Sequence, residues 1–94
     1  MKRANFQTSL PVSILKEGKR FIAYSPALDI STSGRSHVEA RRRFAEASQI
    51  FFEEIMKAGT LEKALIELGW KKNKSRLQPP LVVSQEAYTI KVPA

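Results

Sequence analysis

The hydrophobic period of the chain changes from two residues to about 3.6 near Gly34 and Arg35, and this change constrains the fold more than any other feature. Before it, alternating apolar and polar residues predict short strands. After it, apolar residues recur every three or four positions, which predicts one long amphipathic helix. A small sheet covered by a single helix keeps one face bare, so we expect function to depend on what docks there.

Three strands are expected before the change of period, over residues 6–15, 20–25 and 28–33. Pro11 cannot donate a ladder hydrogen bond and therefore favours an edge position for the first strand. Gly18, within the turn 16–19, can adopt positive φ and joins the first two strands as a hairpin. Short connections predict an antiparallel meander. The residues that share one face of the first strand are Phe6, Thr8, Leu10, Val12 and Ile14.

A long helix is expected from Ser36, followed by a shorter one. Ser36 and Glu39 have the spacing of a capping box, in which each side chain accepts a hydrogen bond from the other's backbone N–H. Gly59 ends the long helix in a left-handed conformation. Thr60 is expected to cap the second helix, which ends at Gly69. The broad apolar side of the long helix comprises Val38, Phe44, Ala45, Ala47, Ser48, Phe51, Phe52, Ile55 and Met56.

The polar side of the long helix predicts ion pairs at i,i+4 spacing. The expected pairs are Glu39 with Arg43, Arg42 with Glu46, and Glu53 with Lys57. Three consecutive arginines span about 200° of helical arc and cannot all face one ligand. We expect Arg41 to be the one that approaches the sheet and lays its stem over it.

The end of the chain is expected to be a basic linker followed by strands. Residues 71–76 carry four cations and no acid, and the pair Pro79-Pro80 follows. Strand character returns at 81–83 and again at 88–92, which predicts one or two late strands. These strands extend the sheet or pair with a second copy.

Size and composition favour one domain with a modest core. Ninety-four residues make a single domain, which we divide into an α/β unit over 1–70 and its linker and tail over 71–94. A hydrophobic content of 43% with 27% charged residues is in the globular range. The predicted fold class is α+β: a three-stranded antiparallel meander packed by one long helix, then a short helix and one or two C-terminal strands (βββααβ).

Cysteine is absent, which excludes disulfides, thiolate metal sites and thiol chemistry. No apolar run approaches the roughly 20 residues of a membrane span, and no signal peptide is recognised. A cytoplasmic protein is therefore expected. Because the core is modest, dimerisation would support it, and part of the apolar cluster on the long helix could seal a homodimer.

The net charge of +7 permits an acidic partner such as nucleic acid. The candidate nucleic-acid site comprises Trp70, Lys71, Lys72, Lys74 and Arg76. In this hypothesis the phosphates contact the cations and a base stacks on the indole. The simpler interpretation is a solvated surface that keeps a small protein in solution, with Trp70 closing one end of the core.

No catalytic constellation is recognised. His37 is the only histidine, and no nucleophile or orienting acid is indicated for it. A meander followed by a helix also suggests a ribonuclease H type of nuclease, which needs several convergent carboxylates to hold two metal ions. The first expected strand has no acid, and Asp29 stands alone on the third. We therefore expect no enzyme activity, no metal site and no cofactor.

The order of motifs over residues 10–68 resembles the HicB-type antitoxins and the small solo domains related to them. The matching residues are Phe21-Ile22-Ala23-Tyr24-Ser25-Pro26-Ala27-Leu28, then Gly34, then Ser36-x-x-Glu39-Ala40. The resemblance implies a partial ribonuclease H-like fold without the nuclease's carboxylates. It also implies a non-enzymatic antitoxin that binds a HicA-type toxin, a small basic ribonuclease, and covers its active site. The partner-binding residues implied are Tyr24, Ser25, Pro26, Leu28 and Arg41.

Overall fold

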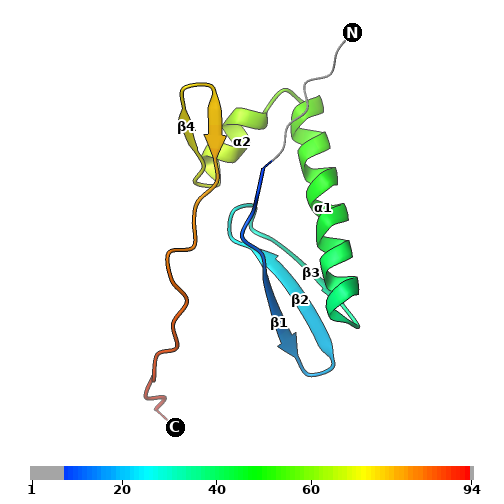
Figure 1. The fold of residues 1–94 in the computed structure, drawn as a ribbon, viewed down its shortest axis with the longest axis vertical. Helices are drawn as coiled ribbons and strands as arrows, with labels where there is room; N and C mark the ends of the chain where they lie inside the picture. The colour runs from blue at the N-terminus through cyan, green and yellow to red at the C-terminus, as the bar shows by residue number, and fades with distance from the viewer. Residues whose placement is uncertain (1–7, 94) are drawn as a thin grey trace.

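The computed structural model describes residues 8–93 and has the predicted α+β architecture (Figure 1). A three-stranded antiparallel sheet is followed by a long helix, a short helix and a two-stranded hairpin, which confirms the predicted class and order. The elements are β1 (Ser13–Glu17), β2 (Arg20–Ser25), β3 (Ile30–Gly34), α1 (His37–Lys57), α2 (Leu61–Glu67), β4 (Lys71–Asn73) and β5 (Arg76–Gln78).

The first sheet is a meander in the order β1-β2-β3. Glu17 pairs with Arg20 across a two-residue turn, and Gly18 at its first position has φ +59°, as a type II′ hairpin requires. The predicted boundaries of the first strand were wrong, because β1 covers only Ser13–Glu17. Since β2 ends at Ser25, which the register sets opposite position 12, residues 8–11 have no strand beside them to pair with; Phe6 lies outside the described residues.

A compact turn over residues 26–29 joins β2 to β3, so the third strand starts later than predicted. The Ser25 carbonyl accepts a hydrogen bond from the Asp29 N–H (2.9 Å), and the Ser25 hydroxyl accepts one from the Ala27 N–H (3.2 Å). Asp29 has φ +53°, a left-handed conformation that Asp tolerates better than most residues. Leu28, expected in the strand, is instead buried inside the turn.

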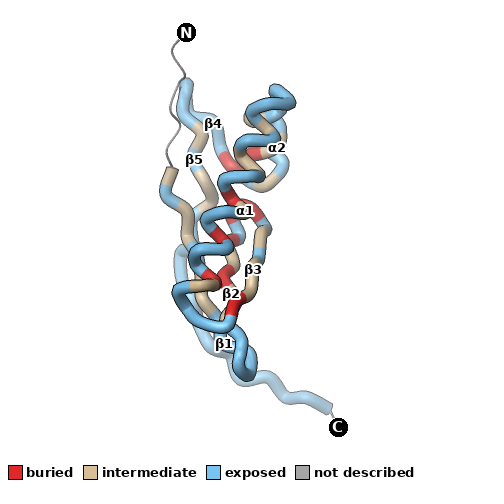
Figure 2. The backbone as a smooth tube through the Cα atoms, turned by 90° about the vertical axis from the view of Figure 1, so that its right-hand side faces the viewer, coloured by how far each residue is buried: buried red, intermediate tan, exposed pale blue. Residues whose placement is uncertain are grey.

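Two small clusters form the core, and both lie on the α1 side of the sheet or at its end (Figure 2). The first comprises Ala23, Ala40 and Phe44, with Ile14, Phe21 and Ile30 packed against it. The second comprises Ala27, Leu28, Leu65 and Trp70, with partly buried neighbours that include Phe51, Phe52 and Leu77. The second cluster therefore fixes α2 and the β4–β5 hairpin to the turn 26–29.

The buried stripe of α1 is narrower than the predicted apolar side. Ala40, Phe44 and Ser48 are buried at i, i+4 and i+8 spacing, whereas Val38 is 70% and Met56 is 50% exposed. Strands of five or six residues support a single line of contacts with a helix of 21 residues. Side chains off that line therefore face solvent.

Ser48 lies on the buried stripe of α1, and its hydroxyl has no hydrogen-bond partner among the described residues. We expect Ser48→Ala to raise the free energy of unfolding by about 0.5–1.5 kcal/mol, because it removes an unpaired buried hydroxyl and improves helix propensity. Denaturant unfolding followed by circular dichroism measures the change. Ser36→Ala is the control and should lower stability by about 1 kcal/mol, since it removes the helix cap. A loss of stability in Ser48→Ala would contradict the expectation.

The ends of the helices differ in detail from the predicted caps. The Ser36 hydroxyl accepts a hydrogen bond from the Glu39 N–H (3.0 Å), as predicted. The Glu39 carboxylate, however, accepts from the N–H of Arg35 (3.1 Å), one residue before the capping serine. Thr60 makes no side-chain cap; its carbonyl accepts from the N–H of Ala64 (2.8 Å). Thr60 is therefore the N-cap residue, as predicted, but the described contacts at this helix start come from its backbone and not from its side chain.

Two of the three predicted helix ion pairs are present. Arg43 lies 3.5 Å from Glu39, and Arg42 lies 3.8 Å from Glu46. Within residues 8–93 no ion pair joins Glu53 to Lys57; Glu53 instead accepts a hydrogen bond from Gln49 (3.0 Å).

Residues 71–78 form the β4–β5 hairpin and not the predicted linker. Leu77 packs into the core beside Trp70, and Lys74 takes φ +58° in the turn, which the charge pattern did not reveal. The late strands predicted at 81–83 and 88–92 are also absent. A strand pattern forms a ladder only where a neighbouring edge supplies hydrogen bonds. Residues 81–93, here named the C-terminal arm, leave the hairpin in an irregular extended path (Figure 1).

Candidate partner-binding surface

The face of the β1-β2-β3 sheet that points away from α1 is here named the bare face. Paired residues of neighbouring strands project to the same side. Because Ile14, Ala23 and Thr32 face α1, their neighbours along each strand project to the opposite side. The bare face therefore presents Ser13, Leu15, Glu17, Arg20, Ile22, Tyr24, Ser31 and Ser33.

A short apolar strip crosses the middle of the bare face. Leu15 is 50% exposed and pairs with Ile22, which is half-buried, and Tyr24 lies beyond them on β2. Hydroxyl groups border the strip, and one of them, Ser33, accepts a hydrogen bond from Arg20 (3.0 Å). Apolar side chains surrounded by small polar groups suit contact with another protein surface. The surface offers no nucleophile–base pair among its residues.

Tyr24 closes the strip at the turn end of the sheet. Its hydroxyl donates a hydrogen bond to Asp29 Oδ1 (3.2 Å), so the phenol and the carboxylate form one polar unit. Desolvation, then this hydrogen bond and the negative charge of Asp29, raise the pKa of Tyr24. The phenol consequently stays protonated at neutral pH and offers an oriented polar group at the edge of an apolar patch.

The five partner-binding residues expected from sequence do not form one surface. Tyr24 is half-buried on the bare face, and Pro26 is exposed on the adjoining turn. Ser25 is 0% and Leu28 is 3% exposed, so they support the turn from inside and offer no contact area. Only Tyr24 and Pro26 lie together and accessible.

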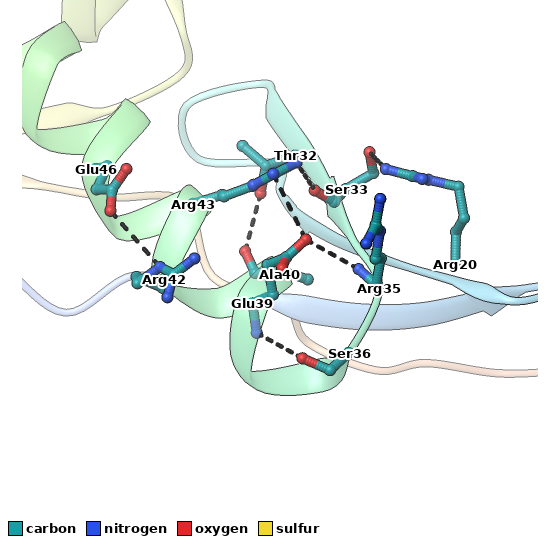
Figure 3. Close-up of polar contacts among 10 residues, drawn as sticks. All are labelled: Arg20, Thr32, Ser33, Arg35, Ser36, Glu39, Ala40, Arg42, Arg43 and Glu46. Carbon is teal, nitrogen blue, oxygen red and sulfur yellow. Dashed lines mark hydrogen bonds and ion pairs between the residues drawn. The ribbon is translucent and has the colours of Figure 1, made fainter.

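Arg41 lies on the outer side of α1, in an open depression that it lines with Val38, Arg42 and Ala45. The expectation that Arg41 approaches the sheet is wrong. Arg43 does so instead, and its Nη1 donates to the Ser33 carbonyl (3.1 Å; Figure 3). The buried positions Ala40 and Phe44 fix the rotation of the helix, and that rotation turns position 43 toward β3.

Charged side chains gather where β3 enters α1 (Figure 3). The hydrogen bond from the Arg35 N–H, and then the charges of the neighbouring arginines, keep the pKa of Glu39 below its usual value, against an opposing effect of desolvation. The carboxylate therefore remains ionised and offsets part of the positive charge of Arg43 and Arg42. This cluster ties the helix start to the sheet.

Two of the nucleic-acid residues expected from sequence, Trp70 and Lys72, make contacts within the fold, and the other three are exposed on the hairpin. Trp70 is 2% exposed, and its Nε1 donates to the Ala27 carbonyl (2.8 Å), so it has no face available to a base. Lys72 pairs with Glu62 of α2 (3.2 Å). Lys71, Lys74 and Arg76 are exposed on the hairpin and form no ion pair with a described residue.

Leu15 and Ile22 were not predicted as surface residues, although a signal was present. Residues 20–25 are apolar on both sides of the strand, which indicates either burial on two faces or an apolar exposed face. The position of the single helix decides whether one face or both faces of this strand are covered. The residue pattern of the strand alone does not show where the helix lies.

Among residues 8–93, no three histidine, aspartate or glutamate side chains are grouped so that they could hold a metal ion. Neither described helix combines the length and hydropathy needed to cross a bilayer. Comparison of the chain with protein-family models, with curated proteins and with solved structures found no match.

Proposed function

We propose that this chain is a non-enzymatic binding module that recognises a protein partner through the bare face. In its most specific form, the proposal is an antitoxin of the HicB-like kind that neutralises a small HicA-type ribonuclease by covering its active site. The observation that supports it is the uncovered apolar strip of Leu15, Ile22 and Tyr24. The motif order over residues 10–68 supports the choice of partner.

The strip must supply most of the binding energy in this proposal. A net charge of +7 does not attract a basic ribonuclease, because like charges oppose association. Desolvation of Leu15 and Ile22, together with the oriented hydroxyl of Tyr24, supplies an attraction that does not depend on charge. Binding should therefore hold or strengthen as salt rises, since salt screens the repulsion.

The test is to examine the adjacent reading frame for a small HicA-type ribonuclease, to co-express that ribonuclease with this chain and to measure RNA cleavage by the purified pair; an adjacent frame that encodes none counts against the antitoxin proposal. We expect the complex to be inactive and Leu15→Asp to weaken binding by about tenfold or more, because it places a charge in the strip. Ile50→Asp is the matched control. It makes the same substitution at similar exposure, 55% against 50%, but on the outer side of α1.

Each result of this experiment bears on the proposal. Equal weakening by both variants would indicate a general effect of charge and would count against the bare face. A ribonuclease that neither binds nor loses activity would overturn the antitoxin proposal. Circular dichroism of both variants confirms that the fold is retained.

A nucleic-acid-binding function is the second candidate, because Lys71, Lys74 and Arg76 are exposed together on one hairpin. It is tested with a single-stranded RNA oligonucleotide and a Lys71→Glu, Lys74→Glu double variant. Binding through phosphates should weaken steeply with salt and be lost in the variant. Binding that is insensitive to both would exclude the hairpin. The double variant leaves the bare face unchanged, so it should still inhibit the ribonuclease if the first proposal is correct.

A further inference from the structure

The C-terminal arm exposes more apolar side chains than any other described segment. Tyr88 is 77%, Ile90 is 73% and Val92 is 80% exposed, and they alternate with Thr89 and Lys91. Such alternation is the pattern of a half-buried strand. Within one copy of the chain these side chains stay exposed and belong to neither core cluster.

The arm also gives the chain an elongated shape. The radius of gyration is 16.1 Å, whereas a compact chain of this length would have about 12 Å. The Pro79-Pro80 pair, which favours an extended backbone, directs the arm away from the hairpin. Residues 81–93, fully extended, span roughly 43 Å at about 3.3 Å per residue. The arm is therefore long enough to reach across a second molecule.

β1 presents an unpaired strand edge. It lies at one end of the order β1-β2-β3, and α1 lies nearer to β3 (Figure 1). At the opposite edge of the sheet, the Arg43 guanidinium donates a hydrogen bond to the Ser33 carbonyl. Glu17 and Arg20 close the two-residue turn and form a hydrogen-bonded pair, so the alternate residues Ile14 and Lys16 direct their backbone N–H and C=O groups outward. An open edge of this kind pairs readily with another extended segment.

We infer that the arm of one copy adds as a strand to the β1 edge of a second copy, and that the reciprocal exchange forms a two-fold dimer. A two-fold exchange satisfies both arms and both edges and then closes, so it does not propagate. Each copy contributes about 13 arm residues and a receiving strand, which approaches the roughly 20 residues per side of a standard interface. The small core described above gives a reason for this association, because a chain with so few buried side chains gains from sharing apolar surface.

The added strand places its apolar side on the face that α1 covers. Ile14 is half-buried there at the side of the sheet farthest from the helix axis, and Phe21 beside it is also half-buried. Tyr88, Ile90 and Val92 would extend this layer, while Thr89 and Lys91 would face the opposite side. Within a single copy the arm touches β1 at one side-chain hydrogen bond, Gln85 to Ser13 (3.1 Å), and forms no backbone ladder with it. The inference is independent of the proposed function, since it uses the edge of the sheet and not its bare face.

The experiment measures the mass of the full chain by sedimentation equilibrium over a micromolar concentration series. The wild type, 10.6 kDa per copy, is expected to be a dimer. Ile90→Asp should raise the dimer dissociation constant by about 100-fold, because it buries a charge, whereas Thr89→Asp on the other side of the arm should change it by less than about threefold.

A second pair of variants tests the receiving edge. Lys16→Ala and Lys16→Pro both remove the side chain, which lies 5.8 Å from the Phe21 ring, but only proline removes the outward N–H. We expect Lys16→Pro to weaken the dimer about tenfold relative to Lys16→Ala, with both variants folded by circular dichroism. A monomeric wild type would overturn the inference, as would a dimer that Ile90→Asp leaves intact. A dimer lost in Ile90→Asp but equal in the two Lys16 variants would overturn the β1 edge as the site.

Discussion

Replacement of Trp70 by alanine is expected to lower the free energy of unfolding by about 3–5 kcal/mol, a large part of the stability of a domain of this size. The indole is 2% exposed and packs at the centre of the cluster that contains Ala27, Leu28 and Leu65. Its ring meets Phe52 edge-on, with centroids 6.4 Å apart. Removal of the ring leaves a cavity among side chains from three separate elements, which cannot all move to fill it.

The hydrogen bond of Trp70 adds a second cost. Its Nε1 donates to the Ala27 carbonyl at 2.8 Å, and loss of the indole leaves that buried carbonyl without its donor. Trp70→Phe separates the two contributions, because it keeps most of the apolar volume and removes the N–H. We expect this variant to lose about 1–3 kcal/mol, less than the alanine variant.

Denaturant unfolding followed by circular dichroism measures both variants, since Trp70 is the chain's single tryptophan and its fluorescence disappears with it. Ile50→Ala, at a 55% exposed position of α1, is the control and should change stability by less than about 0.5 kcal/mol. An alanine variant within about 1 kcal/mol of the wild type would show that the hairpin and the turn 26–29 are not joined in solution as described.

Sequence periodicity predicted the elements whose partners lie nearby in the chain. β2 and the start of α1 at Ser36 were placed correctly, because a hairpin turn and a helix cap are local features. Both errors at the C-terminus arise because local charge and local alternation do not reveal which distant residues a segment packs against or pairs with. Charge in residues 71–76 suggested a linker, although Leu77 anchors a hairpin there, and alternation in residues 81–83 and 88–92 suggested strands that form no backbone ladder within one chain.

The candidate site was predicted less well than the fold, because it depends on helix rotation and on burial within a turn. Ser25 and Leu28 lie within two positions of exposed Pro26, yet they point inward, and the sequence alone does not distinguish them from it. Arg41 and Arg43 differ by two positions, which is about 200° on a helix, and the packing of Ala40 decides which of them meets the sheet. Helix rotation and burial within a turn are set by tertiary packing, which the pattern of a single sequence does not determine.

Gly34→Ala is expected to lower the free energy of unfolding by about 3 kcal/mol, near the upper end of what overpacking costs. A Cβ at this position would lie 2.7 Å from the Ala40 nitrogen and 3.0 Å from the carbonyl carbon and Cβ of Glu39. Two of these three are backbone atoms of the first turn of α1, which cannot rotate aside as a side chain can. The helix start must therefore move away from β3.

That movement would also break the polar contacts that fix α1 to the sheet. The Thr32 hydroxyl donates to the Ala40 carbonyl (3.0 Å), and Arg43 donates to the Ser33 carbonyl (3.1 Å). Gly34 does not have the left-handed backbone that Gly18 has, so crowding alone explains the glycine. Gly18→Ala is accordingly the informative control: its added Cβ meets nothing within 4 Å, and only its φ of +59° is unfavourable, at about 1 kcal/mol.

Denaturant unfolding of the two alanine variants compares the cost of steric crowding at position 34 with the cost of an unfavourable backbone conformation at position 18. If α1 docks on β3 as described, the alanine at position 34 costs clearly more than the alanine at position 18, although only position 18 has a backbone that favours glycine. The reverse order would mean that the first turn of α1 stands farther from the sheet. That result would also contradict the described rotation of α1, which places Arg43 on β3 and Arg41 on the outer side. Both positions depend on the close contact between Gly34 and Ala40.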